Sequence, residues 1–442
     1  MKVTVIPERI GGTIAAIPSK SHLHRLLIFA AFADAPTIVA CRDIGAEDIG
    51  ATIDCLSALG AIIDRNEEGF EVRPVDRAKL PCDSAKPIVF PVGESGSTLR
   101  FMLPIVCALG VRGAFEMKGR LPERPLMPLD EQLEAHGAKI WRDGNILHCE
   151  GRLTHGTYTL PGDISSQYIS GLMMALPLLE KPCVLNVTGN VESAGYITLT
   201  LQAGEAFGHR GHMSKSAHSL EAESSFPAHK NIEYKIRGTG VYNSPGRTDA
   251  EGDWSNAAFW LCAGAMPGGN VRMTGLKQDS VQGDREICDI LKKMGASVKW
   301  EGGDLVVKYD KLRATEIDGR AIPDLIPVLS VVASVARGTT DIRNASRLRI
   351  KESDRLRTTS KTLSALGANI SESSDALTID GVDKLRGGIV EAHGDHRIAM
   401  MAAVASAHAS LPVTITGAQA VNKSYPNFWD DLRLLGKKVI EE

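Results

Sequence analysis

Residues 56–72 read LSALGAIIDRNEEGFEV, in which an apolar run with helical spacing ends at a glycine and two short strand-like runs follow. A helix that ends in this way needs a positive φ angle, which glycine adopts without strain. The residues on either side of the tight turn predict a β-hairpin directly after the glycine. Three further copies are LEAHGAKIWRDGNILHC at 133–149, LKKMGASVKWEGGDLVV at 291–307 and LSALGANISESSDALTI at 363–379. Weaker copies surround Gly208 and Gly436.

A second kind of segment recurs in step with the first. Each copy is small, polar and turn-like, and each precedes an apolar run with helical spacing. The six copies are PSKSHLHR from residue 18, GESGSTLR from 93, GDISSQYI from 162, GDWSNAAF from 252, PDLIPVLS from 323 and GDHRIAMM from 394. Together the two patterns predict about six units of roughly seventy residues each.

The repeats predict an α/β protein in which the helices are buried and the sheets face solvent. The runs GLMMALPLL, FWLCAGAM and MMAAVASAHA are apolar on nearly every side, which is typical of buried helices. A chain of 442 residues is too long for one ordinary core, so we expect two similar domains of three units each. The break should fall in YNSPGRTDAEGD at residues 242–253, a stretch rich in Pro, Gly and Asn.

Composition narrows the class of protein. A formal net charge of −3 and an aromatic content of 5% argue against binding to nucleic acid. The longest apolar run, IPVLSVVASVA, is too short to span a membrane, and MKVTVIPERIGG lacks the apolar region of a signal peptide. The eight cysteines show no metal-binding spacing and are typical of buried thiols in a reducing compartment. We therefore expect a cytoplasmic enzyme with no nucleic-acid or membrane partner. We also expect a monomer.

Basic residues gather at the polar segments and in a few loops. The eight cations are Lys20, Arg25, Arg100, Arg124, Lys351, Arg355, Arg397 and Lys423. Helix N-termini, hydroxyl side chains and basic groups together form anion sites. Each segment alone also has a local interpretation: KESDRL as a solvated helix face, PERP as a loop brace, GDHR as a helix cap and ISSQY as simple capping. Their joint occurrence favours one cleft that holds more than one anionic ligand.

Two details of this charge pattern are open to a structural check. Lys351 and Arg355 share one face if their segment is helical, and Glu352 then lies about a hundred degrees away.

Other chemistries fit poorly, since GGTIAAIPSKS lacks the glycine spacing of a nucleotide-binding loop, RGTGVYN is not a dinucleotide motif and no metal-ligand cluster is present. The sequence thus predicts no cofactor and no metal.

Several segments resemble a known family. PSKSHLHRLL, GESGSTLRF, GRLPERP, GDISSQYISGL, LRIKESDRL, GDHRIAM and NKSYP resemble, in this order, the signature segments of the 5-enolpyruvylshikimate-3-phosphate synthase (3-phosphoshikimate 1-carboxyvinyltransferase) family. The resemblance implies the enolpyruvyl transferase fold, with two similar domains of three βαβαββ units. It implies an N-terminal domain at residues 20–247, a C-terminal domain at residues 1–19 and 248–442, and an active site in the cleft between them.

The resemblance also implies a reaction. The enolpyruvyl group of phosphoenolpyruvate would pass to the 5-hydroxyl of shikimate 3-phosphate, releasing phosphate, in the shikimate pathway to chorismate and aromatic amino acids. These two small molecules are the implied partners, and no metal or cofactor takes part. Two phosphates and two carboxylates on the substrates would account for the eight cations.

Site residues follow from the same resemblance. The implied catalytic residues are Asp324, which accepts the hydroxyl proton, Glu352, which protonates the methylene carbon, and Lys20, which contacts both substrates. Residues implied to bind shikimate 3-phosphate are Lys20, Ser21, Arg25, Ser165, Ser166, Gln167, Ser193, Tyr196, Asp324, Arg347 and Lys351. Residues implied to bind phosphoenolpyruvate are Lys20, Gly96, Arg124, Gln167, Arg355, Arg397 and Lys423.

The chain departs from the family pattern at a few positions. Glu94 stands where many members have Asn, and Arg347 stands at a position that is Asn in other members. Ala194, Gly195 and Thr198 in ESAGYIT replace a Lys-Pro pair and an Asp. These departures bear on substrate affinity and inhibitor sensitivity more than on the type of reaction.

Two alternatives remain. UDP-N-acetylglucosamine enolpyruvyl transferase shares the fold and the chemistry, but carries a reactive Cys in a loop whose counterpart here is Gly119 in KGRLPERP. A non-catalytic, anion-binding relative would have lost Asp324, Glu352 or Lys20, and all three are present.

Overall fold

The chain forms two compact units. The computed structural model describes residues 1–42, 45–82, 84–209, 213–218 and 231–442. One unit, called the N-terminal unit below, comprises Lys20–Asp43 and Glu47–Ala250. The other, the C-terminal unit, comprises Met1–Ser19, Ile44–Ala46 and Glu251–Glu442. The chain passes from the C-terminal unit to the N-terminal unit after Ser19 and back after Ala250, and the short stretch Ile44–Ala46 is also assigned to the C-terminal unit. The passages after Ser19 and after Ala250 are called the two crossings below.

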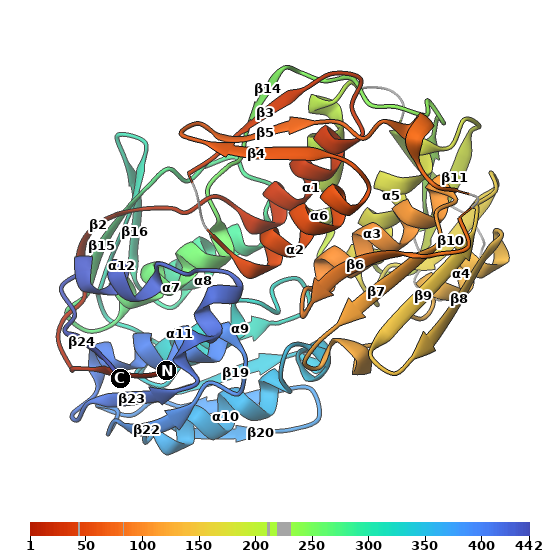
Figure 1. Cartoon of the computed structure of the whole chain (residues 1–442). Coiled ribbons are helices and arrows are strands. Elements are labelled where there is room, and N and C mark those ends of the chain that lie inside the picture. Colours follow the sequence, from red (N-terminus) through yellow and green to blue (C-terminus); the bar gives the residue numbers. More distant parts are fainter. Residues whose placement is uncertain (43–44, 83, 210–212, 219–230) are drawn as a thin grey trace. The chain divides into compact units, whose positions relative to one another are not determined.

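Six four-stranded sheets share one strand pattern (Figure 1). In the N-terminal unit the first sheet has the order β14 (Arg247–Asp249), β3 (Thr37–Ala40), β5 (Gly69–Arg73), β4 (Ile62–Asn66). The second has the order β6 (Ile88–Gly93), β7 (Gly113–Met117), β9 (Ile146–Gly151), β8 (Ala138–Asp143). The third has the order β10 (Thr157–Pro161), β11 (Cys183–Thr188), β13 (Asn231–Ile236), β12 (Met213–His218). In each sheet the first two strands are parallel and the remaining pairs are antiparallel.

The C-terminal unit repeats this pattern. Its orders are β2 (Gly11–Ala15), β15 (Asn270–Thr274), β17 (Asp304–Lys308), β16 (Ser297–Glu301); β18 (Glu316–Asp318), β19 (Thr339–Arg343), β21 (Leu377–Asp380), β20 (Asn369–Glu372); and β22 (Gly388–Glu391), β23 (Val413–Thr416), β1 (Lys2–Val5), β24 (Val439–Glu441). Again the first pair of each sheet is parallel. Strand β1 at the N-terminus completes the last sheet by pairing with β23 and β24, which brings the two chain ends together.

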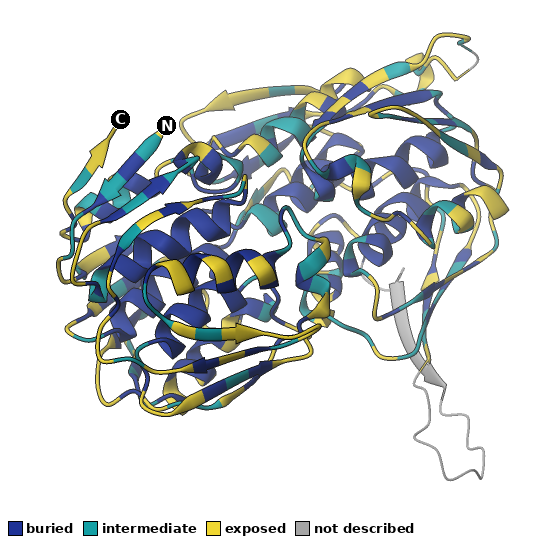
Figure 2. Cartoon of the chain, turned by 90° about the horizontal axis from the view of Figure 1, so that it is seen from below, coloured by how far each residue is buried: buried dark blue, intermediate teal, exposed yellow. Residues whose placement is uncertain are grey.

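The helices supply most of the buried surface, as the sequence predicted. The helices are α1 (Lys20–Ala31), α2 (Glu47–Ala58), α3 (Gly96–Leu109), α4 (Leu129–Ala135), α5 (Ser166–Ala175), α6 (Ala194–Ala206), α7 (Trp254–Ala265), α8 (Ile287–Lys293), α9 (Ile326–Ala333), α10 (Arg355–Ala365), α11 (His396–Ala405) and α12 (Phe428–Leu434). Every residue of α7, α9 and α11 is buried. Figure 2 shows these inner helices in the buried colour, while the strands alternate between buried and exposed residues. The prediction of buried helices and solvent-facing sheets is confirmed.

Both repeated sequence patterns occupy the expected places. The six polar segments contain the first residues of α1, α3, α5, α7, α9 and α11. The six glycines follow the other six helices, and each has a positive φ angle, between 84° at Gly208 and 105° at Gly137. An L-residue with a side chain would be strained in this conformation, so the glycine at each helix end is a backbone requirement.

The two chain crossings lie at equivalent points of the repeat. In an uninterrupted repeat, such as β6, α3 and β7, a helix connects the two parallel strands of one sheet. At the crossings the first strand stays in one unit while the following helix belongs to the other. Strand β2 precedes α1, and β14 precedes α7, so each unit contains a strand whose own helix lies in its partner unit.

The segments at the two crossings are hydrogen-bonded to each other. The Ser19 amide donates to the Glu251 carbonyl at 2.7 Å, and the Asp253 amide donates to the Ile17 carbonyl at 2.8 Å. This is a short antiparallel pair. The two connections therefore act as one two-stranded element and not as two independent linkers.

Gln282 binds this pair from one side. Its Oε1 accepts from the Ser19 hydroxyl and the Trp254 amide, both at 3.1 Å. Its Nε2 donates to Glu251 Oε1 at 2.7 Å and to the Gly252 carbonyl at 2.8 Å. The residue is only 3% exposed, so water cannot replace these partners easily.

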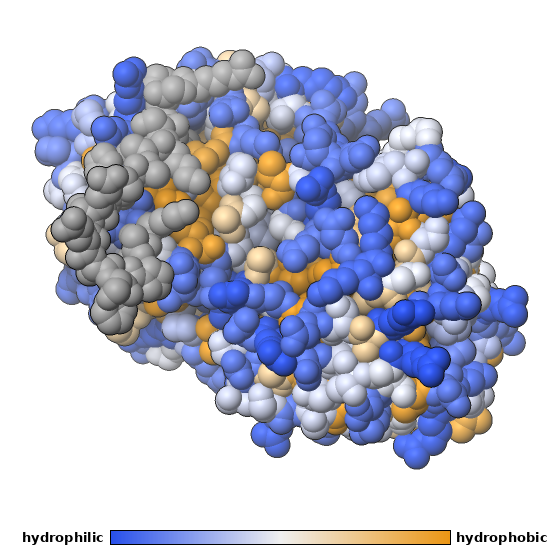
Figure 3. All heavy atoms as spheres, turned by 180° about the vertical axis from the view of Figure 1, so that it is seen from behind, coloured by the Kyte–Doolittle hydropathy of each residue, from blue (hydrophilic) through white to orange (hydrophobic). Residues whose placement is uncertain are grey.

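Among the described residues, no helix is both long enough and apolar enough to cross a lipid bilayer. Figure 3 shows one face of the molecule, on which hydrophobic residues form separate areas between hydrophilic ones. The most exposed large apolar side chains, Ile389 at 73% and Leu434 at 67%, are single residues of this kind. Such scattered exposure is normal for a globular protein.

We predict that Gln282→Leu destabilises the protein. The substitution keeps the side-chain size but leaves the Trp254 amide and the Gly252 carbonyl without their partner, and it removes one of the two hydrogen bonds to Glu251 Oε1. Each buried polar group left unpaired costs about 1–3 kcal/mol, so the free energy of unfolding should fall by about 2–4 kcal/mol. Urea unfolding followed by tryptophan fluorescence measures the change. The control is Gln278→Leu, whose side chain is exposed, and equal stability of the two variants would contradict the prediction.

Candidate active site

Lys20 is the first residue of α1, as predicted, and its charge is balanced within the N-terminal unit. Its Nζ lies 2.5 Å from Oδ2 of Asp48, in the first turn of α2. The two side chains are 16% and 14% exposed. This ion pair connects the N-termini of two helices. Asp48 escaped the sequence analysis because no local pattern links it to a residue 28 positions earlier.

Gly96 begins α3 and lies against two guanidinium groups. A Cβ atom at this position would be 2.5 Å from Nη1 of Arg124 and 2.7 Å from Nη1 of Arg100. The absence of a side chain thus allows both cations to approach the helix N-terminus, which itself favours anions. The Nε atom of Arg124 is buried with no hydrogen-bond partner among the described residues. These features together suit a carboxylate or phosphate group.

Gln167 connects this anion-binding region to α5. Its Oε1 accepts from Nη1 of Arg100 at 3.0 Å, and its Nε2 donates to the hydroxyl of Ser97 at 2.8 Å. Ser165 caps α5 by accepting from the Gln167 amide, and Ser166 is the first residue of the helix. The sequence analysis counted Arg100 among the cations without giving it a role, and its place beside Gly96 was not predicted.

Arg25 is held by the protein itself. Its Nε donates to the Thr200 hydroxyl at 2.7 Å, and its other nitrogens donate to the carbonyls of Ser21 at 2.6 Å and Tyr196 at 3.2 Å. The guanidinium also lies 5.0 Å from the ring centroid of Phe101. Burial lowers the pKa of Arg25 to about 10. In this arrangement Arg25 braces α1 against α6, and a role in binding ligand stays a prediction.

Ser193 precedes α6 in a conformation that favours glycine. Its φ angle is 54°, and the residue is buried. Backbone strain at a residue with a side chain is found most often at functional sites. Its neighbour Tyr196, in the first turn of α6, is half-buried.

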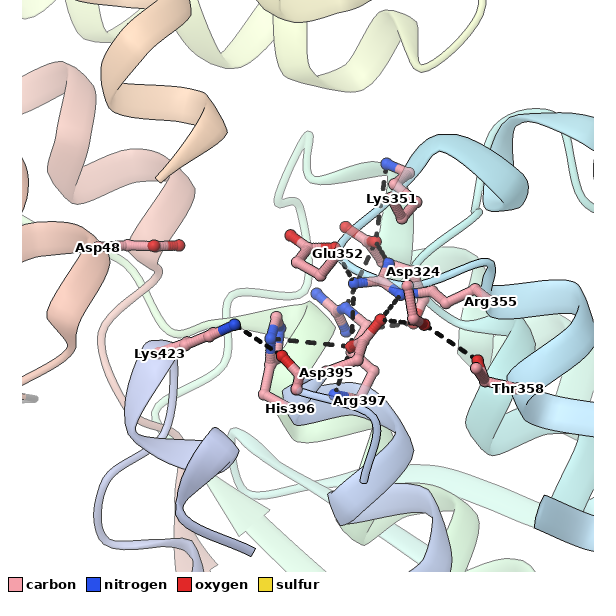
Figure 4. A network of polar contacts seen from close by, with 12 residues as sticks. Asp48, Asp324, Lys351, Glu352, Arg355, Thr358, Asp395, His396, Arg397 and Lys423 are labelled. Carbon is pink, nitrogen blue, oxygen red and sulfur yellow. Dashed lines mark hydrogen bonds and ion pairs between the residues drawn. The ribbon is translucent and has the colours of Figure 1, made fainter. Parts of the chain in front are cut away.

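Arg355 is the centre of the charged cluster in the C-terminal unit (Figure 4). The residue is only 1% exposed. Its Nε donates to Oδ2 of Asp395 at 2.8 Å, and its Nη1 donates to Oδ1 of Asp324 at 2.7 Å. Its Nη2 donates to Oε2 of Glu352 and to the second oxygen of Asp395. One buried cation therefore fixes three carboxylates, two of which are the predicted catalytic base and acid.

Asp395 supports Arg355 from the protein interior. Its side chain is fully buried, and it also accepts from the Ser353 hydroxyl and the Arg397 amide, each at 3.0 Å. The second of these bonds caps α11. The sequence analysis anticipated a helix cap at Asp395, but the ion pair with Arg355 joins segments 40 residues apart and has no local signal.

Asp324 lies in the turn before α9 and faces three cations. Burial alone would raise the pKa of its carboxyl. The charges of Arg397, Lys351 and Arg355 outweigh burial and hold that pKa well below its ordinary value. The distances from Asp324 Oδ1 are 3.3 Å to Arg397 Nε, 3.9 Å to Lys351 Nζ and 2.7 Å to Arg355 Nη1. Asp324 is therefore ionised in the ligand-free protein.

The conditional prediction of a shared helix face for Lys351 and Arg355 was wrong. Helix α10 begins at Arg355, because Asp354 caps it by accepting from the Arg357 amide. Lys351 instead ends a short 3₁₀ helix, Ser346–Ile350. Both cations nevertheless reach Asp324, because the intervening bend turns the backbone.

Two other predicted residues lie near this cluster in the C-terminal unit. Lys423 ends the 3₁₀ helix Ala418–Lys423, and its Nζ donates to the Gly394 carbonyl at 2.6 Å. Gly394 directly precedes Asp395. Arg347 is half-buried in the 3₁₀ helix that leads to Lys351.

The predicted residues thus form two half-sites, one in each unit. The N-terminal half-site contains the predicted residues Lys20, Ser21, Gly96, Arg124, Ser165, Ser166, Gln167, Ser193 and Tyr196 with Asp48 and Arg100 beside them. The C-terminal half-site contains Asp324, Arg347, Lys351, Glu352, Arg355, Arg397 and Lys423 with Asp395 behind them. Each half-site presents several cations around helix N-termini, which suits anionic small molecules.

We predict that anion binding by the C-terminal half-site weakens as the pH rises through about 8. Burial lowers the pKa of Lys351 to about 8, with Arg355 and Arg347 acting in the same direction and Asp324 opposing them. The ammonium therefore loses its charge in this range, and with it the attraction for an anion. Calorimetric titration with shikimate 3-phosphate on both sides of this pH measures the effect.

Lys351→Arg is the matched variant for this experiment. An arginine stays charged over the whole range, so its affinity for the same ligand should stay level through pH 8. Equal pH dependence in the two proteins would contradict the assignment of this titration to Lys351.

Comparison with known proteins finds similarity over almost the whole chain. The family model of EPSP synthase (3-phosphoshikimate 1-carboxyvinyltransferase) matches residues 5–432. A 3-phosphoshikimate 1-carboxyvinyltransferase of Clostridium botulinum (strain Alaska E43 / Type E3) is 39% identical over 437 residues, covering 98% of this chain and 96% of that protein. The enzyme of that name from Clostridioides difficile (strain 630) is 37% identical over 453 residues, covering 99% and 98%.

Solved structures show the same fold. The EPSP synthase of Acinetobacter baumannii superimposes with a TM-score of 0.76 at 23% identity and covers 100% of both chains. The enolpyruvyl transferase NikO of Streptomyces tendae has a TM-score of 0.76 at 19% identity and covers 99% of this chain and 98% of its own. The predicted fold class is therefore confirmed.

Proposed function

We propose that this chain, which belongs to the EPSP synthase (3-phosphoshikimate 1-carboxyvinyltransferase) family, transfers the enolpyruvyl group of phosphoenolpyruvate to the 5-hydroxyl of shikimate 3-phosphate. The products are 5-enolpyruvylshikimate 3-phosphate and phosphate. This reaction belongs to the shikimate pathway, which leads to chorismate and the aromatic amino acids. The single observation that carries the proposal is the attachment of Asp324 and Glu352, the candidate base and acid, to one buried guanidinium.

The first step is addition across the double bond of phosphoenolpyruvate. The 5-hydroxyl oxygen forms a bond to the carbon that bears phosphate, and its proton passes to Asp324. Glu352, which takes up a proton from solvent, gives it to the methylene carbon, which becomes a methyl group. An acid and a base acting together in this way are the ordinary means of such an addition.

The second step reverses the proton transfer at carbon. Glu352 takes a proton back from the methyl group, the bond between carbon and the phosphate oxygen breaks, and phosphate leaves. The double bond is restored on the new ether. The hydroxyl proton leaves with phosphate or enters solvent, so atoms and charges balance without a cofactor.

Substrate binding makes Asp324 a stronger base. In the ligand-free protein three cations hold its pKa low, which makes it a weak proton acceptor. A phosphate or carboxylate that pairs with Arg397, Lys351 or Arg355 offsets that charge, and the pKa of Asp324 rises toward its ordinary value. The base is thereby activated when the substrates are bound.

Both half-sites contribute to binding in this proposal. Phosphoenolpyruvate contacts Gly96 and Arg124 from the N-terminal unit and Arg355, Arg397 and Lys423 from the C-terminal unit. Shikimate 3-phosphate contacts the starts of α1, α5 and α6, and Lys20 contacts both substrates. A monomer that acts in the cytoplasm is part of this proposal.

The alternative acceptor, UDP-N-acetylglucosamine, is disfavoured by the environment of Gly119. A Cβ atom on Gly119 would lie 2.5 Å from the carboxyl group of Glu94, and the glycine has a positive φ of 54°. At the position that carries a reactive cysteine in that family, a side chain would here displace the carboxyl end of Glu94 and adopt a strained backbone conformation. Glu94, which departs from the usual Asn, fills the space.

A phosphate-release assay tests the function directly. We predict release of phosphate from phosphoenolpyruvate only when shikimate 3-phosphate is also present, and none with UDP-N-acetylglucosamine in its place. Lys20→Met should lower the rate by at least about a hundredfold, because it removes a positive charge that contacts both substrates. Lys79→Met, at an exposed position, should leave the rate unchanged.

Two outcomes would contradict the proposal. Release with UDP-N-acetylglucosamine would assign the chain to the alternative reaction. No release with either acceptor, from a protein with a normal melting temperature, would favour a non-catalytic relative.

A further inference from the structure

Four buried side chains of the N-terminal unit form a continuous chain of hydrogen bonds. His24 Nδ1 on α1 lies 2.7 Å from Thr52 Oγ1 on α2. Thr52 Oγ1 lies 2.7 Å from Thr98 Oγ1 on α3, which lies 2.8 Å from the hydroxyl of Ser95. None of the four residues is more than 2% exposed. We call them the His24 chain; it connects three helices through polar atoms in an otherwise apolar interior.

The His24 chain ends at two parts of the N-terminal half-site. Ser95 caps α3 by accepting from the Thr98 amide, so it sets the backbone at Gly96. Thr98 Oγ1 also reaches the Asp48 carbonyl at 3.3 Å, and the Asp48 carboxylate binds Lys20. The chain therefore contacts the residues that place both the Lys20 ammonium and the helix N-terminus beside Arg124.

We assign the direction of these bonds from His24 Nε2, because a lone pair left without a partner in the interior costs less than an unpaired N–H. In that direction Thr98 gives its one hydroxyl proton to the Asp48 carbonyl, and its oxygen accepts from Ser95 and Thr52. Thr52 has then used its own proton, and its oxygen accepts from His24. This assignment places the proton of the imidazole on Nδ1 and leaves Nε2, which is buried with no hydrogen-bond partner, as a bare lone pair.

A neutral ring at His24 is consistent with its surroundings. Burial, together with the charges of Lys20 and Arg25, holds the pKa of His24 well below its ordinary value. A charged ring would need an acceptor at Nε2 and would repel both cations. Among the described residues, no group accepts a hydrogen bond from Nε2.

We propose that His24 is a positioning residue that acts through Thr52 and Thr98 to fix the Asp48 carbonyl and the N-terminal cap of α3, and thereby places Lys20 and Gly96 for phosphoenolpyruvate. The proposal rests on the proposed function in taking these two residues as substrate contacts. Small errors in such placement are costly, because the reacting groups must meet within a few tenths of an ångström.

Two variants of Thr98 separate hydrogen bonding from packing. Thr98→Val keeps the shape but breaks the chain in its middle, whereas Thr98→Ser keeps the hydroxyl and loses a methyl group. With shikimate 3-phosphate saturating, Thr98→Val should raise KM for phosphoenolpyruvate about tenfold or more, with a smaller change in kcat. Thr98→Ser should stay within about threefold of the native KM. A packing role would give the opposite order of the two variants.

Thr340→Val is the matched control. Thr340 in β19 is fully buried, and its hydroxyl has no partner among the described residues. Its replacement makes the same chemical change outside the His24 chain, so KM should not move.

Nitrogen NMR of histidine-labelled protein provides a readout that does not depend on turnover. Native His24, identified by the signal lost in His24→Asn, should be neutral with its proton on Nδ1. Thr52→Val removes the acceptor and should abolish the preference for that tautomer. If Thr98→Val fails to fold, this measurement still tests the positioning proposal.

The outcomes distinguish the two proposals. No turnover by the native protein contradicts the proposed function, and with it the role of the His24 chain. Native turnover with an unchanged KM in Thr98→Val, or a His24 proton on Nε2, contradicts the positioning proposal alone.

Discussion

The ion cluster around Arg355 is the constraint on which the C-terminal half-site depends. A guanidinium that is 1% exposed is stable only with charged partners, and here it has Asp324, Glu352 and the fully buried Asp395. Asp395 binds Arg355 from the protein interior and also caps α11. It therefore fixes the Arg355 guanidinium relative to the start of α11, where Arg397 lies. The candidate base and acid are then placed by a group that substrate can also bind. Any variant that removes one partner leaves buried charge uncompensated.

Lys20 of the N-terminal half-site lies directly at the first of the two chain crossings. Lys20 is the first residue of the N-terminal unit after the first crossing, while Ser19 remains bound to Gln282 and Glu251 in the C-terminal unit. The candidate dual-substrate lysine thus adjoins the element through which the two units are connected. Asp48 and the His24 chain attach it to its own unit. These contacts fix Lys20 relative to Gly96 within the N-terminal unit.

The parts of the fold that could be predicted are those with a local chemical cause. Positive φ angles at helix ends require glycine, and helix N-termini require small polar residues, so both repeats could be recognised from sequence. The pairing of β2 and β14 has no such local cause, because each strand pairs with residues more than two hundred positions away; only the family resemblance implied that β2 belongs to the C-terminal domain. For the same reason Asp48 beside Lys20, and Thr52 beside Thr98, carry no local signal. Lys351 does not share a helix with Arg355, because Asp354 caps α10 and the helix begins only at Arg355. The family resemblance supplied the candidate residues, and the structure supplied their unrecognised supports, Asp395 and Arg100 among them.

The central claim is that Glu352, held by Arg355, protonates the methylene carbon of phosphoenolpyruvate before phosphate leaves by cleavage of its bond to carbon. A reaction run in heavy water and stopped at partial turnover tests it, with NMR of the vinyl group of the product. The methylene group passes through a methyl intermediate, so deuterium should appear in the vinyl group. Glu352→Gln should sharply lower both the exchange and the rate, whereas Glu372→Gln, at an exposed position, should change neither. A vinyl group free of deuterium at partial turnover, or a product carrying the transferred phosphate, would contradict the account.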